Sequence, residues 1–416
     1  MALDLSKVNK VHFIGIGGIG ISAIARLFLQ SGKQVTGSDQ TLDSPVIAEL
    51  KKRDAKIYHG QRARQVPRQV DLVIYSFAIS EDNPERRAAT RRGLPLLSYP
   101  AALGLLSQGK FTIAVAGTHG KTTTAAMLGT ICRAAKLDPT VIVGSLMKAG
   151  KTNLWIGRSD YFIVEACEYR RSFLHLSPRI LVITNIDNDH LDYYRDLADI
   201  QSAFAALAAK VPRGGKVITE KKYGQIKLPI RLLLSGRHNQ RNAQAAIAAA
   251  KAVGVSERLA RQALSKFRGT WRRFEAKGRT RRGALIYDDY AHHPTEIRAT
   301  VQAARERFPK ERLVLAFQPH LYSRTKLLFS DLAESLAAAD EVLLLPIYAA
   351  RERPDSAINS RLLAAAVSQA GTPTRYFGTF QTAEKYLNQQ LSRGDLLLTL
   401  GAGDIFVLGE KLRYPH

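Results

Sequence analysis

Seven consecutive residues have the types and spacing of a phosphate-binding loop. An apolar segment, residues 111–116, runs into Gly117, Thr118, His119, Gly120, Lys121, Thr122 and Thr123, and a helical segment follows. In a P-loop, backbone N–H groups and the helix N-terminus surround phosphates, the lysine reaches the terminal phosphates, and the next hydroxyl binds Mg²⁺. We predict these roles for Lys121 and Thr122. The alternative is a glycine-rich turn without a ligand, since Val115 stands where the generic pattern has its first glycine.

A second glycine-rich turn lies near the start of the chain. Gly15, Gly17 and Gly20 fit the pattern G-x-G-x-x-G, with Gly18 between them, and Asp39 follows Gly20 by 19 residues. This spacing is typical of a dinucleotide fold, in which the helix N-terminus meets a pyrophosphate and the acid meets a ribose. A UDP-sugar satisfies the same geometry as a nicotinamide dinucleotide. The alternative is a tight turn that binds nothing.

Acidic residues follow two more apolar segments. Glu165 ends the segment 161–165, and Asp187, Asp189 and His190 come after the segment 180–185. Carboxylates at the ends of strands beside a P-loop commonly help to hold Mg²⁺. The alternative is a group of acids that cap a helix.

Two polar groups precede the last third of the chain. Asn239 and Asn242 stand at the start of an alanine-rich helical segment, 239–253, where they can cap the helix and contact an adenine edge. Arg272 and Arg273 follow Gly269, and a guanidinium there can bind phosphate in a bidentate manner. A solvated basic turn is the alternative for the arginines.

The loop after residues 284–289 is dense in polar side chains, and another polar loop follows residues 313–317. The first loop contains Asp288, Asp289, Tyr290, His292 and His293, and the second contains His320 and Arg324. The histidines can bind metal, carry protons or orient a carboxylate, or they can form a satisfied structural pair. Six of the ten histidines lie in such loops, and α/β folds bind ligands at the carboxyl ends of their strands.

The elements that position these residues alternate between strand and helix, which predicts an α/β fold with parallel sheets. Predicted strands cover residues 10–14, 71–76, 94–98, 111–116, 161–165, 180–185, 284–289, 313–317, 341–346 and 395–400. Loops predicted at residues 107–109 and 275–283 divide the chain into domains 1–108, 109–276 and 277–416.

The chain has 416 residues and a formal charge of +25, of which residues 109–276 carry +15. Nine basic residues and one acidic residue fall within 210–241 alone. The excess indicates polyanionic partners: nucleic acid, phosphate-bearing ligands or an anionic membrane face. Two cysteines exclude a disulfide framework, and no apolar run predicts a transmembrane or signal segment. We expect a cytoplasmic protein.

Taken in order, these motifs resemble the Mur ligase family. The matching stretches begin at His12, Gly117, Glu165, Thr184, Gly236, Gly269, Asp288, Gln318, Ser323 and Gly401. The resemblance spans almost the whole chain. It implies a Rossmann-like N-terminal domain for a UDP-sugar, a central P-loop ATPase domain and a Rossmann-like C-terminal domain for an amino acid.

The resemblance also implies an activity and roles for particular residues. The implied reaction joins L-alanine to the lactyl carboxylate of UDP-N-acetylmuramate through an acyl phosphate, with ATP and Mg²⁺, during peptidoglycan precursor synthesis. For the UDP-sugar, the resemblance implies that Gly15–Gly20 and Asp39 contact the diphosphate and ribose and that Ser76 lies near the uridine. For ATP, it implies that Lys121 and Arg273 contact the phosphates, that Asn239 and Asn242 contact adenine, and that Thr122, Glu165 and His190 bind magnesium. His293 and Arg324 would contact the amino acid or the reacting carboxylate.

Other functions compete with this interpretation. A sister ligase that adds a peptide to the same UDP-sugar shares most motifs. An NAD-dependent oxidoreductase leaves Lys121 unexplained, and a nucleic-acid-dependent P-loop ATPase leaves the loop at 288–296 idle. We therefore expect no specific nucleic-acid partner, and we regard the basic excess in 210–241 as a solvated surface or a peripheral contact with an anionic membrane. The stretch 211–234 is short for the family, so we expect strands of the central domain to be missing. Separately, we expect the chain to be a monomer or a dimer.

Overall fold

The computed structural model describes residues 3–228, 232–350 and 352–414, so residues 229–231 of the basic stretch 210–241 lie outside it. The described residues form two compact units. The first contains residues up to 186 together with 198–225 and 245–263, and the second contains 187–197, 226–244 and the residues from 264 onward. Each unit is described separately below.

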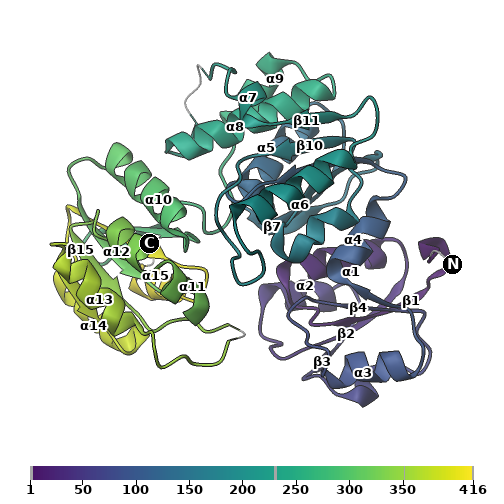
Figure 1. Cartoon of the computed structure of the whole chain (residues 1–416), viewed down its shortest axis with the longest axis horizontal. Helices are drawn as coiled ribbons and strands as arrows, with labels where there is room; N and C mark the ends of the chain where they lie inside the picture. Colours follow the sequence, from purple (N-terminus) through teal and green to yellow (C-terminus); the bar gives the residue numbers. More distant parts are fainter. Residues whose placement is uncertain (1–2, 229–231, 351, 415–416) are drawn as a thin grey trace. The chain divides into compact units, whose positions relative to one another are not determined.

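The first unit begins with a five-stranded parallel sheet in the order β3-β2-β1-β4-β5, drawn in purple and dark blue in Figure 1. Its strands are β1 (Lys10–Ile14), β2 (Gln34–Asp39), β3 (Lys56–His59), β4 (Leu72–Tyr75) and β5 (Leu96–Ser98). Its helices are α1 (Ile19–Gln30), α2 (Pro45–Lys51), α3 (Pro84–Arg91) and α4 (Tyr99–Ser107), with short 3₁₀ turns at Leu5–Lys7 and Ala63–Gln65.

A six-stranded sheet in the order β11-β10-β6-β9-β7-β8 completes the first unit. Its strands are β6 (Phe111–Ala116), β7 (Thr140–Met147), β8 (Thr152–Trp155), β9 (Tyr161–Glu165), β10 (Ile180–Ile183) and β11 (Lys216–Ile218). The associated helices are α5 (Lys121–Ala134), η3 (Tyr169–His175), α6 (Leu197–Ala209), α7 (Glu220–Tyr223), α8 (Arg237–Ala252) and α9 (Glu257–Leu264). Strand β6 is almost wholly buried, as a central parallel strand covered on both faces must be.

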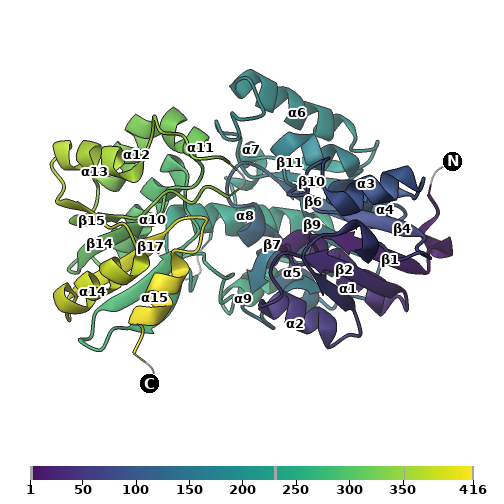
Figure 2. The same ribbon diagram turned by 90° about the horizontal axis from the view of Figure 1, so that it is seen from below.

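The second unit is built on a six-stranded sheet in the order β12-β13-β17-β14-β15-β16. Its strands are β12 (Glu275–Arg279), β13 (Leu285–Asp289), β14 (Arg312–Phe317), β15 (Glu341–Leu344), β16 (Thr374–Tyr376) and β17 (Asp395–Leu400). Its helices are α10 (Pro294–Arg307), α11 (Tyr322–Leu327), α12 (Phe329–Leu336), α13 (Ser360–Gln369), α14 (Phe380–Gln390) and α15 (Phe406–Leu412). Figure 2 shows α12 and α13 on one side of this sheet and α14 and α15 on the other, and an apolar core lies on each side.

The α/β prediction is confirmed, but two of its details are wrong. Strand β8 runs antiparallel to β7, and β12 runs antiparallel to β13, so two of the three sheets are mixed. The loop predicted at 275–283 is also wrong, because Glu275–Arg279 form β12. This edge strand is polar and only partly buried, so it lacks the apolar pattern by which strands are recognised in a sequence. Among the described residues, no helix is long and apolar enough to span a bilayer.

Candidate active site

The P-loop connects β6 to α5 in the first unit, as the sequence predicts. Gly117 has a φ of 136°, and a Cβ at this position would overlap the Thr184 hydroxyl, so only glycine fits. The loop backbone is held from β10: the His119 N–H donates to Asn185 Oδ1 at 2.8 Å, and the Thr184 hydroxyl donates to the His119 carbonyl at 2.6 Å. The turn is therefore fixed before any ligand enters it.

The Lys121 ammonium group lies inside this loop and contacts a carboxylate. Its Nζ donates to the carbonyls of Gly117 and Thr118 at 2.6 and 2.9 Å, and it lies 2.9 Å from Glu168 Oε2. Burial alone would lower the pKa of Lys121, but the charge of Glu168 reverses this effect and raises the pKa above its usual value. Lys121 is consequently a permanent cation at the place where phosphates would bind.

Two of the three predicted magnesium ligands meet in the first unit. The Thr122 hydroxyl donates to Glu165 Oε2 at 2.8 Å, and the Gly144 N–H donates to the same oxygen at 2.6 Å. A hydroxyl and a carboxylate are oxygen donors of the kind that Mg²⁺ prefers. The donor set of Thr122 and Glu165 thus fits the predicted ion, whereas His190 belongs to the second unit.

Asp39, predicted as a ribose ligand, contacts the N-terminal glycine loop directly. The Gly17 N–H donates to Asp39 Oδ2 at 2.8 Å, and a Cβ on Gly17 would lie only 2.9 Å from that oxygen. Ser76 follows β4, and its N–H donates to the carbonyl of Ile14 at the end of β1. Gly20 packs against the ring of Tyr99 so closely that a Cβ would lie 2.6 Å from Tyr99 Cζ. The predicted UDP-sugar residues Gly15, Gly17, Gly18, Gly20, Asp39 and Ser76 therefore gather at the ends of β1, β2 and β4.

Arg324 and Asp189 form the charged centre of the second unit. Arg324 Nη2 lies 3.0 Å from Asp189 Oδ1, and Nη1 lies 3.0 Å from His320 Nδ1. Burial would raise the pKa of Asp189, but the charges of His190 and Arg324 hold it well below its usual range. His190, with a φ of 54°, lies on the same pocket of about 630 Å³ as Arg324. The site therefore combines a fixed cation with a cavity of small-molecule size.

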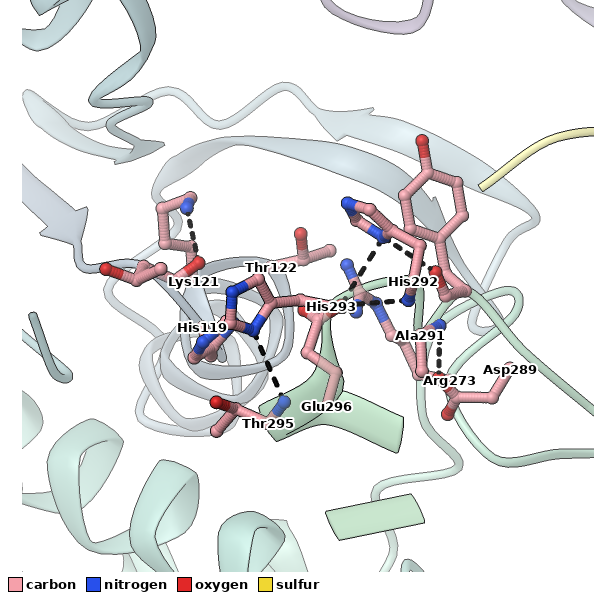
Figure 3. A network of polar contacts seen from close by, with 12 residues as sticks. His119, Lys121, Thr122, Arg273, Asp289, Ala291, His292, His293, Thr295 and Glu296 are labelled. Carbon is pink, nitrogen blue, oxygen red and sulfur yellow. Dashed lines mark hydrogen bonds and ion pairs between the residues drawn. The ribbon is translucent and has the colours of Figure 1, made fainter. Parts of the chain in front are cut away.

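The two histidines after β13 have different surroundings (Figure 3). His293 caps α10 by accepting the Thr295 N–H at Nδ1, and its Nε2 lies 2.9 Å from the Asn188 carbonyl. His292 lies 3.0 Å from the Tyr290 carbonyl and 3.4 Å from Glu296, and burial together with Arg324 lowers its pKa to about 4. Both rings are therefore held in position, and His292 is neutral at pH 7.

The two arginines predicted as possible phosphate ligands differ in burial and in their partners. Arg272 is buried: its Nε lies 2.8 Å from Asp288, and it donates to the carbonyls of Gly401 and Gly403, so it ties β13 to the loop after β17. Arg273 is partly exposed, lies over the Tyr290 ring and is 3.9 Å from Glu296. The structure therefore makes Arg272 a structural residue and leaves Arg273 as the phosphate candidate.

Asn239 and Asn242 are buried in the first part of α8, whose residues up to 244 belong to the second unit and whose remaining residues belong to the first. Asn239 Nδ2 donates to the Ser235 carbonyl at 2.7 Å, and Asn242 Nδ2 lies 3.4 Å from Asn239 Oδ1. Because α8 begins at Arg237 and the Asn239 side chain donates to a carbonyl, the capping interpretation of Asn239 is wrong.

Sequence reasoning missed two partners of the predicted residues: Glu168, which contacts Lys121, and Asn185, which contacts His119, were given no role in the site. Asp189 was predicted only as a possible metal ligand, whereas the structure pairs it with Arg324. Glu168 stands three residues after Glu165, and Asn185 follows the end of β10 by two residues. Their position at strand ends was the available signal.

The fold and these contacts define a nucleotide-dependent α/β enzyme with a P-loop. The chain belongs to the Mur ligase family: the model of the Mur ligase family catalytic domain matches residues 10–111, that of the Mur ligase middle domain matches 115–224, and that of the Mur ligase glutamate ligase domain matches 272–403.

Individual relatives resemble the chain over almost its whole length. It is 40% identical to a UDP-N-acetylmuramate–L-alanine ligase of Agathobacter rectalis over 99% of both chains. That alignment has 456 positions against 416 residues here, so the relative contains segments that this chain lacks. A UDP-N-acetylmuramate–alanine ligase structure from Thermotoga maritima superposes with a TM-score of 0.82 at 29% identity, covering 97% of this chain and 98% of that one. A murein peptide ligase from Psychrobacter arcticus follows with 0.71 at 25% identity, covering 97% of both.

Proposed function

We propose that the protein joins L-alanine to the lactyl carboxylate of UDP-N-acetylmuramate, at the expense of ATP and with Mg²⁺, in peptidoglycan precursor synthesis. The observation that carries this proposal is the 40% identity, over 99% of both chains, to a ligase named for these substrates. The division into domains 1–108, 109–276 and 277–416 remains part of the proposal, although β12 (Glu275–Arg279) crosses the second boundary and pairs with β13 of the third domain. We further propose that the enzyme acts in the cytoplasm.

The chemistry begins with a carboxylate that is a poor acyl donor. Transfer of the terminal phosphoryl group of ATP to the lactyl carboxylate forms an acyl phosphate and releases ADP. The amino group of alanine then attacks the activated carbonyl, and phosphate leaves. Lys121 neutralises charge on the transferred phosphoryl group, and its pairing with Glu168 keeps it protonated in the loop.

The residues assigned to nucleotide and metal follow from their contacts. Thr122 and Glu165, with His190 as a further ligand, would hold Mg²⁺, which when bound neutralises phosphate charge. Gly117 to Thr123 surround the phosphates, Arg273 is assigned to a phosphate of ATP, and Asn239 and Asn242 face adenine. Gly15 to Gly20, Asp39 and Ser76 bind the UDP-sugar.

The pocket of the second unit suits the amino acid. Arg324 is only 9% exposed and is oriented by Asp189 and His320, so it presents a fixed guanidinium to the carboxylate of alanine. His293 contributes to this site by fixing the start of α10, which it caps. The cavity holds more than alanine requires, so the choice among alanine, glycine, serine and a peptide must be measured.

The experiment is phosphate release measured with each substrate omitted in turn. Release should require UDP-N-acetylmuramate, ATP, Mg²⁺ and alanine together. Phosphate release that does not depend on the UDP-sugar would contradict the assignment. A panel of glycine, serine and a murein tripeptide in place of alanine separates the alanine ligase from the peptide-adding sister enzyme.

A further inference from the structure

The first unit contains a pocket of about 730 Å³ that the proposed reaction does not use. Its walls come from α1, α2, the end of α5 and the β7–β8 hairpin. None of the glycine-loop residues 15–20, nor Asp39, Ser76 or the P-loop, lines it. The pocket is therefore separate from the two nucleotide loops of this unit.

The lining of this pocket is strongly basic. Five cationic side chains line it: Arg26, Arg53, Arg133, Lys151 and Arg158. The two acids that also line it are already engaged, since Glu49 lies 2.8 Å from Arg53 Nε and Asp138 accepts the Arg158 N–H at 3.0 Å. Five cations against two acids leave the lining with a net formal charge of +3.

Arg26 distinguishes this pocket from an ordinary basic surface. Arg26 is only 9% exposed. Its Nη1 donates to the Thr152 hydroxyl at 2.8 Å, and its Nη2 donates to the Asn153 side chain. Both acceptors are neutral. The Nε of Arg26 has no hydrogen-bond partner, and Arg26 forms no ion pair among the described residues. The charge of Glu49 acts on Arg26 without forming an ion pair with it, and Glu49 is itself paired with Arg53. The buried guanidinium is therefore only partly compensated, and a bound anion would offset the cost of its burial.

The outer wall of the pocket is preorganised as well. The Arg133 guanidinium lies 4.5 Å from the centre of the Trp155 ring, which holds this long side chain at the pocket edge. Ordered guanidiniums recognise phosphate oxygens in pairs, and 730 Å³ is within the range of small-molecule sites.

We propose that this pocket binds a small, multiply charged phosphate compound at a site distinct from those of ATP and the UDP-sugar. The burial of Arg26 against neutral partners, the cationic lining and the stacked Arg133 together favour a ligand with several negative charges. Because the site lies outside the proposed reaction, its occupancy is measured independently of turnover.

The test uses inorganic tripolyphosphate as the probe, with a non-hydrolysable ATP analogue and Mg²⁺ present in excess to occupy the P-loop. The chain has two tryptophans, so Trp271→Phe leaves Trp155 in the pocket wall as the only tryptophan, which can be excited at wavelengths that tyrosine does not absorb. We expect saturable quenching of Trp155 and one binding event by calorimetry. The variant Arg133→Gln/Arg158→Gln changes two exposed residues and should weaken binding about tenfold or more, as the loss of charge-assisted hydrogen bonds predicts.

The matched control is Lys216→Gln/Lys221→Gln, which removes the same charge from exposed positions of the same unit that do not line the pocket. This control should bind tripolyphosphate as the unmodified protein does. Equal weakening in both double variants means unspecific charge attraction and overturns the proposal, as does the absence of saturable quenching. Turnover without tripolyphosphate should be the same in the pocket variant and the control.

Discussion

Lys121 of the P-loop and Glu168 after β9 form an ion pair of 2.9 Å, across 47 residues of sequence. The Lys121 side chain is 13% exposed and that of Glu168 only 2%, so the two charges depend on each other. Breaking a buried pair costs more than the pair contributes, because the remaining charge is left uncompensated.

Removal of Glu168 should therefore destabilise the protein. Glu168→Gln is expected to lower the free energy of unfolding by about 3 kcal/mol. The double variant Lys121→Met/Glu168→Gln should recover part of this loss, because it leaves no isolated charge. Chemical denaturation of the four proteins in the cycle measures the coupling, and strictly additive losses would contradict the mutual dependence.

Removal of the Lys121 ammonium group should reduce turnover severely. Lys121→Ala is expected to lower kcat by about a hundredfold or more, as for the loss of one preorganised group at a developing charge. UDP-sugar binding, measured by calorimetry, should survive. Lys110→Ala, which removes an exposed lysine paired with Asp160, is the control and should retain activity. Turnover retained by Lys121→Ala would exclude the P-loop role.

Asp39 should affect KM for the UDP-sugar but not KM for ATP. Asp39→Ala removes the acceptor of the Gly17 N–H and is expected to raise KM for UDP-N-acetylmuramate about tenfold. KM for ATP should stay within error, because the P-loop lies at the end of a different sheet. An equal rise in both constants would indicate general damage to the first unit.

Thr122 and Glu165 should determine the concentration of Mg²⁺ that the reaction needs. Thr122→Val removes the hydroxyl that lies 2.8 Å from Glu165, and we expect phosphate release to need about tenfold more Mg²⁺ for half-maximal rate. Thr122→Ser keeps the hydroxyl and should restore the normal requirement. An unchanged magnesium titration in Thr122→Val would remove Thr122 from the metal site, and chelation with EDTA should stop turnover in every variant.

His292 predicts a loss of stability in mild acid. Its pKa is lowered from 6.5 to about 4 by burial, so below pH 6.5 the unfolded chain takes up a proton that the folded chain cannot hold. The free energy of unfolding should fall as the pH drops from 6.5 to 4, with about 3 kcal/mol from this residue. His292→Gln should flatten the profile in this window, whereas His59→Gln, at an exposed position, should not. Identical slopes in all three proteins would contradict the assignment.

Much of the fold was readable from the sequence because strands and glycine turns are local features. The bounds of β1, β6, β9 and β17 agree with the predicted segments, since each is an apolar run followed by a turn or a polar loop. The polar strand β12 was not recognisable in this way, because an edge strand is defined by its neighbour rather than by its own pattern.

The sequence by itself determined the two glycine loops, the lysine and hydroxyl of the P-loop, and the family of the chain, because these depend on residues adjacent in the chain. Only the tertiary structure decided which partners they have. It joined Lys121 to Glu168 and Arg324 to Asp189, and it separated buried Arg272 from partly exposed Arg273. The physical reason is that such partners come from loops brought together by strand order, and strand order is set by packing over the whole sheet rather than by any local spacing.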